Sequence, residues 1–485
     1  MNADSKPSIT GSAPQEIAVL TRTSPNSLSF TAIQKAKTTS IFAALIVFAA
    51  SSVQQARAAD LTPSGAEKAG TSSGIPAWSP PEAMGSGWSY GKRRMDFFKY
   101  KSDEPLYTID ATSVEKYADK LSPGQIALIK NVKGYTMPVY PSRRTCGIPD
   151  IVAENTKKNA GFAKMSADGL ALADAYTPGI PFPVPKTGAE AMWNAKLRYR
   201  GVGVEFPRAY TVVSPRKGST DWIKTVADQY GYLPWAVKSG TTFAKDDQVE
   251  ALFYFNYLSP AALAGQGAMF TVSATKPTEV FYYFPGQRRT RRMPSYSYDA
   301  PQIGYENQFN LDEAYVFSGQ LDRFDWKLVG KRELIVPYNA FGMYDFTAKL
   351  EDVMQPDFVA ASHRRYELHR VWVVEATVRQ GMRHSAPKRL FYIDEDSWSL
   401  VGAVDYDSQG NIWKVREGHL IPVYETGTCD ATAMVQYNVT DGRYVVDSVT
   451  IGNGKDTSWI VDGAGNPHMK VDFYNSENLR AMSER

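Results

Sequence analysis

Two short stretches of the chain carry large apolar side chains at almost every position. Leu252-Phe-Tyr-Phe-Asn-Tyr-Leu258 and Val280-Phe-Tyr-Tyr-Phe284 are rich in the aromatic residues that favour strands. Side chains alternate between the two faces of a strand, so a half-exposed antiparallel strand alternates apolar with polar residues. Both faces of this predicted sheet must therefore be covered. Helices suit one face, and the other either lines a cavity or joins a sandwich core, which periodicity alone slightly favours.

The second half of the chain predicts consecutive short strands. Asp- and Gly-containing turns such as Pro285-Gly-Gln287, Asp394-Glu-Asp-Ser397 and Asp407-Ser-Gln-Gly410 separate them. This rhythm indicates an antiparallel meander. The predicted strands cover residues 251–258, 278–284, 288–293, 326–336, 365–379, 388–393, 398–406 and 411–418.

The first part of the chain predicts an extended arm and then helices. Residues 60–103 are rich in Gly, Pro and Ser. Ser122-Pro-Gly-Gln125 and Thr187-Gly-Ala-Glu190 are capping boxes, each of which starts a helix. The second of these helices is predicted to end at Gly201, and a further helix is predicted over residues 149–163.

The N-terminal residues resemble a signal peptide. Lys35 and Lys37 precede the apolar run 41–50, which is too short to span a bilayer, and cleavage is predicted near Ala58. The alternative is a membrane-anchoring helix. Cleavage would give a soluble exported chain, because no later stretch approaches eighteen unbroken apolar residues.

Export also decides how to interpret the cluster formed by Arg288, Arg289, Arg291 and Arg292. Residues 1–58 hold five basic and two acidic residues, which account for the whole net charge of +3. A neutral exported chain is a poor nucleic-acid binder, so we expect no nucleic-acid partner. Ordinary salt bridges explain the cluster most simply, and an anionic headgroup at a cavity mouth is the alternative.

The sequence shows no metal-binding or catalytic motif. It contains no G-x-S-x-G elbow, phosphate-binding loop, H-E-x-x-H motif or dinucleotide fingerprint, so we expect no cofactor, no metal and no enzyme activity. The two cysteines, Cys146 and Cys429, permit a disulfide in an oxidising compartment, and two unpaired thiols are the alternative.

Several longer motifs resemble one family. It is a domain of unknown function of Gram-negative periplasmic proteins, often described as outer-membrane lipoprotein-sorting-like. The resemblance runs in order over nearly the whole chain after residue 58. Its motifs include Leu121-Ser-Pro-Gly-Gln125, Tyr135-Thr-Met-Pro-Val-Tyr-Pro141, Ile180-Pro-Phe-Pro-Val-Pro-Lys186, Asp322-Arg-Phe-Asp-Trp-Lys-Leu-Val-Gly330, Arg365-Tyr-Glu-Leu-His-Arg-Val-Trp372 and Phe391-Tyr-Ile-Asp-Glu-Asp-Ser-Trp398.

The resemblance implies a LolA/LolB-like α+β fold. This is an open, mainly antiparallel half-barrel around a hydrophobic cavity, wrapped by the arm and the helices. It explains the double-sided strands better than a sandwich does, and it replaces the sandwich as our expectation. The implied organisation is a signal peptide (1–58), an arm (59–110) and one domain (111–485). That domain divides into a helical section (111–201) and a meander (204–485).

The same resemblance implies a function without chemistry. The favoured hypothesis is a periplasmic carrier for a lipid or another hydrophobic molecule, such as those of alkane uptake. The alternatives are an adaptor for an inner-membrane transporter of the resistance–nodulation–division type or an outer-membrane protein, and an envelope hydrolase. The candidate cavity wall consists of Phe253, Phe255, Tyr257, Phe281, Tyr283, Trp372 and Val374, with Arg289 and Arg291 as headgroup or rim residues.

Overall fold

One large sheet organises the protein. The computed structural model describes residues 60–81, 85–237, 241–245, 248–294 and 296–483, and sixteen of the described strands form this sheet. In the order in which they pair, the strands of its main path are β1 (Tyr107–Ile109), β2 (Met137–Tyr140), β12 (Tyr366–Val378), β13 (Lys388–Asp394), β14 (Leu400–Tyr406), β15 (Ile412–Gly418), β18 (Met434–Asn438), β19 (Arg443–Val449), β5 (Gly203–Val213), β6 (Ile223–Tyr232), β7 (Val249–Ser259), β8 (Gly267–Ser273), β9 (Glu279–Phe284) and β10 (Arg289–Arg292).

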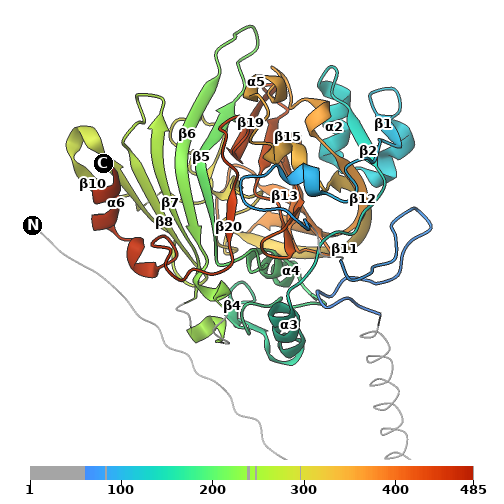
Figure 1. The fold of residues 1–485 in the computed structure, drawn as a ribbon, viewed down its shortest axis with the longest axis horizontal. Coiled ribbons are helices and arrows are strands. Elements are labelled where there is room, and N and C mark those ends of the chain that lie inside the picture. The colour runs from blue at the N-terminus through green and yellow to red at the C-terminus, as the bar shows by residue number, and fades with distance from the viewer. Residues whose placement is uncertain (1–59, 82–84, 238–240, 246–247, 295, 484–485) are drawn as a thin grey trace, which may run out of the picture. The chain divides into compact units, whose positions relative to one another are not determined.

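The sheet is open and almost wholly antiparallel. Strands β1 and β10 end the path without pairing with each other, and they lie at opposite sides of the sheet in Figure 1. Two more strands attach beside the path, β11 (Phe324–Pro337) to β12 and β20 (Ser458–Ile460) to β5, and only β2 and β12 pair in parallel. The predicted fold class, a mainly antiparallel open α+β half-barrel, is confirmed. Two small separate sheets pair β16 (Ile421–Val423) with β17 (Thr428–Asp430) and β3 (Lys164–Met165) with β4 (Leu172–Asp174).

Short helices cover both faces of the sheet. We call the face toward which Phe253 and Phe255 point the inner face, and the opposite one the outer face. Helix α4 packs on β11 and β12, while α6 packs on β8 and β9 and α2 on β14 and β15. The described α-helices are α2 (Pro123–Asn131), α3 (Asp150–Phe162), α4 (Gly188–Lys196), α5 (Leu350–Val353) and α6 (Ser476–Ser483). The described 3-10 helices are η1 (Arg94–Phe97), η2 (Val114–Lys120), η3 (Pro234–Ala236), η4 (Phe243–Lys245), η5 (Pro285–Gln287), η6 (Leu311–Glu313), η7 (Phe341–Tyr344), η8 (Ala361–His363) and η9 (Val471–Phe473).

Both predicted capping boxes start helices. Ser122 and Gln125 exchange hydrogen bonds at the start of α2, and Thr187 and Glu190 do the same at the start of α4. The end of α4 differs from the prediction, because the helix stops at Lys196 and not near Gly201. The Arg198 guanidinium turns back to donate to the carbonyl of Ala195 at 2.8 Å, and this bond satisfies one of the free carbonyls at the helix end.

The N-terminal arm is fixed to the sheet by side chains of later strands. The guanidinium of Arg370 donates to the carbonyls of Glu67 and Ala69 at 2.7 and 2.9 Å. The Trp398 indole donates to the carbonyl of Ser64 at 2.9 Å. The arm therefore lies against the sheet as an integral part of the domain. The predicted signal peptide, 1–58, lies outside the described residues, in which no helix is long and apolar enough to cross a membrane.

The two cysteines form a disulfide in the structure. Cys146 and Cys429 are bonded across a sequence separation of 283 residues, and both side chains are buried. The bond joins the segment before α3 to β17, and so links the helical section to the end of the meander. Closing so long a loop lowers the entropy of the unfolded chain, which on the chain-entropy model stabilises the fold by about 5 kcal/mol.

We expect the double variant Cys146→Ala, Cys429→Ala to fold with a lower stability. The loss should be about 2–5 kcal/mol in the free energy of unfolding, because the unfolded chain regains the freedom that the bond removes. Urea unfolding followed by tryptophan fluorescence measures the loss. A reducing agent should lower the unfolding midpoint of the parent protein and leave that of the variant unchanged. Equal midpoints of parent and variant without reductant would contradict the prediction.

His419 gives the fold a dependence on pH. Its side chain is fully buried, and neither ring nitrogen has a hydrogen-bond partner among the described residues. Burial, and after it the positive charge of Arg364, lowers the pKa of His419 to about 3. An unfolded histidine has a pKa of about 6.5. The folded state thus binds fewer protons than the unfolded state between these values, and stability falls as the pH drops below about 6.5.

We expect His419→Leu to lose less stability on acidification than the parent protein does. Leucine fills a similar space and takes up no proton, so this part of the pH dependence disappears. Between pH 7 and pH 4.5 the difference should amount to about 2 kcal/mol. Unfolding midpoints measured in urea across this range test it, and parallel curves for the two proteins would refute the assignment to His419.

Candidate functional site

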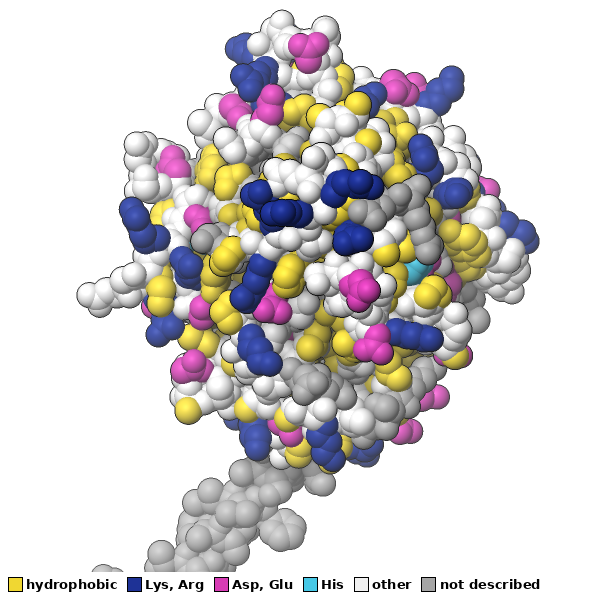
Figure 2. Space-filling model, turned by 90° about the vertical axis from the view of Figure 1, so that its left-hand side faces the viewer, with side chains coloured by type: hydrophobic (Ala, Val, Ile, Leu, Met, Phe, Trp, Pro, Cys, Tyr) yellow, Lys and Arg dark blue, Asp and Glu magenta, His cyan; other side chains and the backbone are white. Residues whose placement is uncertain are grey.

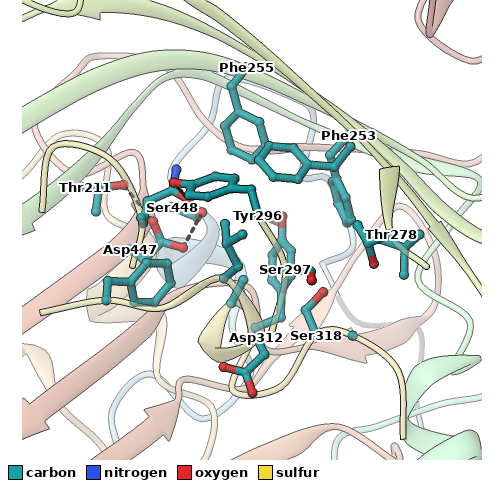
Figure 3. A pocket seen from close by; sticks show the side chains of 18 of the residues that line it. Thr211, Phe253, Phe255, Thr278, Tyr296, Ser297, Asp312, Ser318, Asp447 and Ser448 are labelled. Atoms are coloured by element: carbon teal, nitrogen blue, oxygen red, sulfur yellow. Dashed lines mark hydrogen bonds between the residues drawn. The ribbon is translucent and has the colours of Figure 1, made fainter. Parts of the chain in front are cut away.

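A cavity of about 90 Å³ lies on the inner face of the sheet. Strands β5, β6, β7, β8 and β19 supply one wall, and a single irregular segment supplies the other (Figure 3). From the sheet the wall takes Thr211, Gln229, Phe253, Phe255, Tyr257, Phe270, Val272, Asp447 and Ser448, and Thr278 precedes β9. From the irregular segment it takes Tyr296, Ser297, Tyr298, Gln302, Tyr305, Phe309, Leu311, Asp312, Ala314, Tyr315, Ser318 and Gly319.

We call residues 296–323 the crossing segment, because they pass over the inner face between β10 and β11. Apart from the one short helix η6, the described segment contains no helix or strand. Side chains hold its first part in place: the Tyr296 hydroxyl accepts from the amide of Ile303 at 2.8 Å, and Gln302 donates to the Tyr257 hydroxyl at 3.1 Å. The cavity exists because this segment closes over the aromatic face of β7 and β8.

A buried ion network holds the middle of the crossing segment. Asp312 accepts from the guanidinium of Arg389 at 2.5 Å and from the imidazole of His384 at 2.9 Å. Glu313 accepts from the Lys414 ammonium at 2.7 Å. Burial alone would raise the pKa of Asp312, but Arg389 and His384 outweigh it and hold the pKa below its ordinary value. The segment is thus bound to β13 and β15 through charges.

The sheet completes this network with its own charges. Arg416 on β15 pairs with both oxygens of Asp405 on β14, at 2.6 and 2.8 Å, and Arg389 reaches the same carboxylate at 3.0 Å. Burial raises the pKa of Asp405, but the two arginines outweigh this effect and lower it to about 2. Every one of these side chains is almost fully buried. Removing one member would leave buried charges unpaired, which costs several kcal/mol.

The polar end of the cavity is formed by Asp447 and Ser448. The Thr211 hydroxyl donates to one carboxylate oxygen of Asp447 at 2.6 Å, and the Ser448 hydroxyl donates to the other at 3.1 Å (Figure 3). Neighbouring residues of a regular strand point to opposite faces. Here the register of β19 against β5 shifts between Val446 and Val449, and Ser448 has a φ of +56°. This bulge lets both consecutive side chains line the cavity, as bulges beside functional sites commonly do.

Three of the seven predicted wall residues line the cavity. Phe253, Phe255 and Tyr257 point inward from β7 at every second position. The prediction followed from the double-sided pattern of this strand. Its other face, which includes Leu252 and Tyr254, packs in the outer-face cluster.

Phe281 and Tyr283 are placed on the opposite face from the predicted one. Both belong to the outer-face cluster that packs around Leu479 of α6, while Val280 and Tyr282 of β9 point inward. Both faces of β9 carry large apolar side chains, so the sequence did not indicate which set faces the cavity. A shift of one residue exchanges the two faces of a strand.

Trp372 and Val374 point inward but lie away from the cavity. Trp372 lies with its ring nearly parallel to that of Trp398, at a centroid distance of 6.2 Å. Val374 is fully buried in the core where α4 packs on β12. The helix and the second tryptophan fill this end of the inner face, so both side chains belong to the core.

Arg289 and Arg291 lie at the free edge of the sheet and do not line the cavity. In the register of the β9–β10 hairpin they stand opposite Phe284 and Tyr282, which places them on the inner face. Both side chains are exposed, and neither forms an ion pair within 4.0 Å in the described part of the chain. Of the cluster, only Arg292 has such a partner, Glu279 at 2.7 Å.

Most of the wall was missed by the sequence prediction. Tyr305, Phe309 and Tyr315 come from the crossing segment, which has neither the alternation of a strand nor the period of a helix. Its density of aromatic residues was the available signal. Asp447 was also missed, although it is a carboxylate within the apolar strand Tyr-Val-Val-Asp-Ser-Val that ends at Val449.

One buried group has the residue types of a metal site. Ligand atoms of His369, Asp394 and Asp396 lie within 4.8 Å of one another. Arg144 already pairs with Asp396 at 2.6 Å, and Ser397 donates to Asp394. Burial, and after it the charge of Asp396, raises the pKa of Asp394 to about 7. Arg144 and Ser397 thus occupy oxygens of both carboxylates and His369 bonds Glu367, so we assign this cluster no metal.

Comparison with known proteins places the chain in a family. The family model described as "Protein of unknown function (DUF1329)" matches residues 108–480. "Uncharacterized protein PA3922" of Pseudomonas aeruginosa is 35% identical over 414 residues, which cover 84% of this chain and 89% of that protein.

Solved structures show weaker likenesses. A putative outer membrane lipoprotein-sorting protein domain from Vibrio parahaemolyticus is 12% identical, with a TM-score of 0.40, over 60% of this chain and 98% of its own. A DUF1329 family protein from Desulfovibrio piger is 14% identical, with a TM-score of 0.35, over 57% and 92%. The LolA superfamily protein NE2245 from Nitrosomonas europaea is 9% identical, with a TM-score of 0.33, over 60% and 99%. On the family match and the close relative together, the chain belongs to the DUF1329 family, as its motifs predicted.

Proposed function

We propose that the protein binds an apolar small molecule and carries it through the periplasm without changing it chemically. The observation that supports this function is the aromatic cavity between the inner face and the crossing segment. Burying apolar surface contributes about 25 cal/mol per Å², which gives affinity without any catalytic group. Among the described lining residues there is no histidine, cysteine or lysine.

The periplasmic location belongs to the same proposal. A basic, apolar and small-residue pattern resembling a signal peptide precedes the domain. The buried disulfide between Cys146 and Cys429 suits an oxidising compartment. The partners that would supply or receive the cargo, a transporter of the inner membrane and a protein of the outer membrane, follow from the sequence resemblance and remain part of the proposal.

The size of the cavity sets a condition on binding. The cavity measures about 90 Å³, whereas pockets for drug-sized ligands measure roughly 300–1,000 Å³. A lipid tail would therefore enter only if part of the crossing segment moved outward. The ion network fixes Asp312 and Glu313. The movement is expected in residues 296–309, where neutral hydrogen bonds hold Tyr296 and Gln302. Glu306 pairs there with Arg216 and Arg443, but its carboxylate is exposed to solvent and such pairs are weak.

We expect Phe255→Gln to weaken the binding of a neutral hydrophobic probe by about tenfold, because the wall loses a contact worth roughly 1.5–3 kcal/mol. Fluorescence titration with N-phenyl-1-naphthylamine measures the dissociation constant. Phe281→Gln is the matched control, because it makes the same change on the outer face.

The parent protein should bind the probe, and Phe281→Gln should bind it with the parent affinity. Hydrogen exchange with and without probe should show changed protection in residues 296–309. Failure of the parent protein to bind any hydrophobic probe would overturn the carrier function. Equal losses in both variants would mean that the cavity is not the binding site.

A second observation favours docking at a surface of opposite charge. Strand β10 is the last strand of the sheet, and its exposed side chains Arg289 and Arg291 follow the exposed Arg288. Figure 2 shows basic side chains spread over this side of the molecule, with hydrophobic ones between them. We propose that this edge contacts anionic lipid headgroups where cargo is exchanged. Each arginine near such a surface contributes about 1 kcal/mol.

We expect the triple variant Arg288→Gln, Arg289→Gln, Arg291→Gln to bind anionic vesicles about a hundredfold more weakly. Sedimentation with phosphatidylglycerol vesicles at low and high salt measures this, and salt should remove the difference. Lys101→Gln, Lys116→Gln, Lys133→Gln removes the same charge from exposed positions in the first part of the domain and should leave binding unchanged. Equal effects of the two triple variants would show that net charge, and not this edge, determines binding.

A further inference from the structure

The charges in the cavity wall point to a class of ligand. Resting on the proposed function, we propose that the cavity selects apolar molecules with a positively charged nitrogen headgroup, for which Asp447 is the counter-ion. Such molecules include protonated long-chain amines and quaternary ammonium compounds. The headgroup would lie at the end formed by β5 and β19, and the apolar part along the aromatic side chains of β7 (Figure 3).

The wall has negative groups and no positive ones. Its described lining residues include two carboxylates, Asp312 and Asp447, and no lysine, arginine or histidine. Asp312 already pairs with Arg389 and His384. Asp447 has no ion pair within 4.0 Å among the described residues, so it is the carboxylate of this wall that still lacks a cation.

Asp447 has room to accept more hydrogen bonds. Each of its oxygens accepts from one hydroxyl, of Thr211 or Ser448, whereas a carboxylate offers about four acceptor sites. The Ser448 hydroxyl also lies 3.2 Å from the amide oxygen of Gln229, so its one proton reaches only one of the two acceptors at a time, and Thr211 is the constant donor to Asp447. Burial nevertheless raises the pKa of Asp447, because the negative charge is removed from water without a compensating cation. A cation bound in the cavity would supply that compensation.

Aromatic rings surround the same end of the cavity. Tyr257, Tyr305 and Tyr315 all line it. Tyr315 already contacts the guanidinium of Arg200 and stacks on Phe253, so the ligand cation is assigned to Tyr257 and Tyr305. Burial is the largest cause of the raised pKa of each phenol, and the charge of Asp447 is a further cause in all three, which places them within electrostatic reach of the carboxylate. The faces of aromatic rings attract cations, and aromatic cages are the usual recognition site for quaternary ammonium groups.

An anionic headgroup fits this wall poorly. The guanidinium of Arg200 lies 4.9 Å from the centre of the Tyr315 ring and lines a separate space of about 50 Å³. Arg198 lines that same space and pairs with Asp430 at 3.0 Å. A carboxylate or phosphate in the main cavity would have no basic partner among the described lining residues. The negative charge of Asp447 in the same wall would repel it.

The test compares ligands that differ only in the headgroup. Dodecyltrimethylammonium, dodecanol and dodecanoate share one chain and carry a positive, a neutral and a negative head. Each is titrated against N-phenyl-1-naphthylamine as the displaced probe, the two charged compounds below their critical micelle concentrations and dodecanol below its solubility limit. We expect the ammonium compound to bind the parent protein about tenfold more tightly than either of the others.

Variants then assign the preference to Asp447. Asp447→Asn should lose the preference for the cation and retain the parent affinity for dodecanol, while Asp447→Glu should keep the preference. Asp119→Asn, which removes the charge of an exposed side chain on η2, is the control and should behave as the parent protein does.

Binding of dodecanol or dodecanoate as tight as that of the ammonium compound would overturn the inference and leave the carrier function standing. A preference that survives in Asp447→Asn would also overturn it. If no member of the series displaces the probe from the parent protein, and the probe itself does not bind, both the inference and the carrier function fail.

Discussion

The buried ion network on the inner face is the interaction on which the site depends. Asp312 and Glu313 bring two negative charges from an irregular segment into the core, where Arg389 and Lys414 neutralise them. Buried charges cost several kcal/mol unless they are paired and hydrogen-bonded. The network is therefore specific, because a displaced crossing segment would take Glu313 away from Lys414 and Asp312 away from Arg389, which would keep Asp405 alone as its partner.

This network divides the inner face into two halves with different chemistry. On β13, β14 and β15 the inner face includes the charged side chains of Arg389, Asp405, Lys414 and Arg416, which hold the crossing segment. On β7 and β8 the inner face is largely aromatic. The segment covers it through neutral hydrogen bonds and through the exposed carboxylate of Glu306, contacts that are weaker than buried ion pairs. One half thus anchors the segment, and the other is the half in which we propose that it opens for a ligand.

Much of the fold could be predicted from the sequence, because alternation and turn chemistry act locally. The alternation and turn signals predicted strands close to the observed β7, β9 and β11–β15. The capping boxes predicted where α2 and α4 begin. The inward face of β9 could not be predicted, since Phe281 and Tyr282 are equally suited to either side. The ion network could not be predicted from the sequence either. Asp312 and Arg389 are distant in the chain, and each resembles an ordinary surface charge.

Asp447 shows how the site could be found only when sequence and structure are combined. The sequence places one carboxylate among the valines of β19, and the structure shows that a bulge turns it and Ser448 into the cavity together. A half-buried carboxylate without a cation destabilises a fold, and so does a serine at positive φ. Departures of this kind from the local rules are expected at functional sites. Both costs fall on adjacent residues inside the aromatic cavity, and the cationic ligand that we propose would offset the first of them by supplying a positive charge beside Asp447.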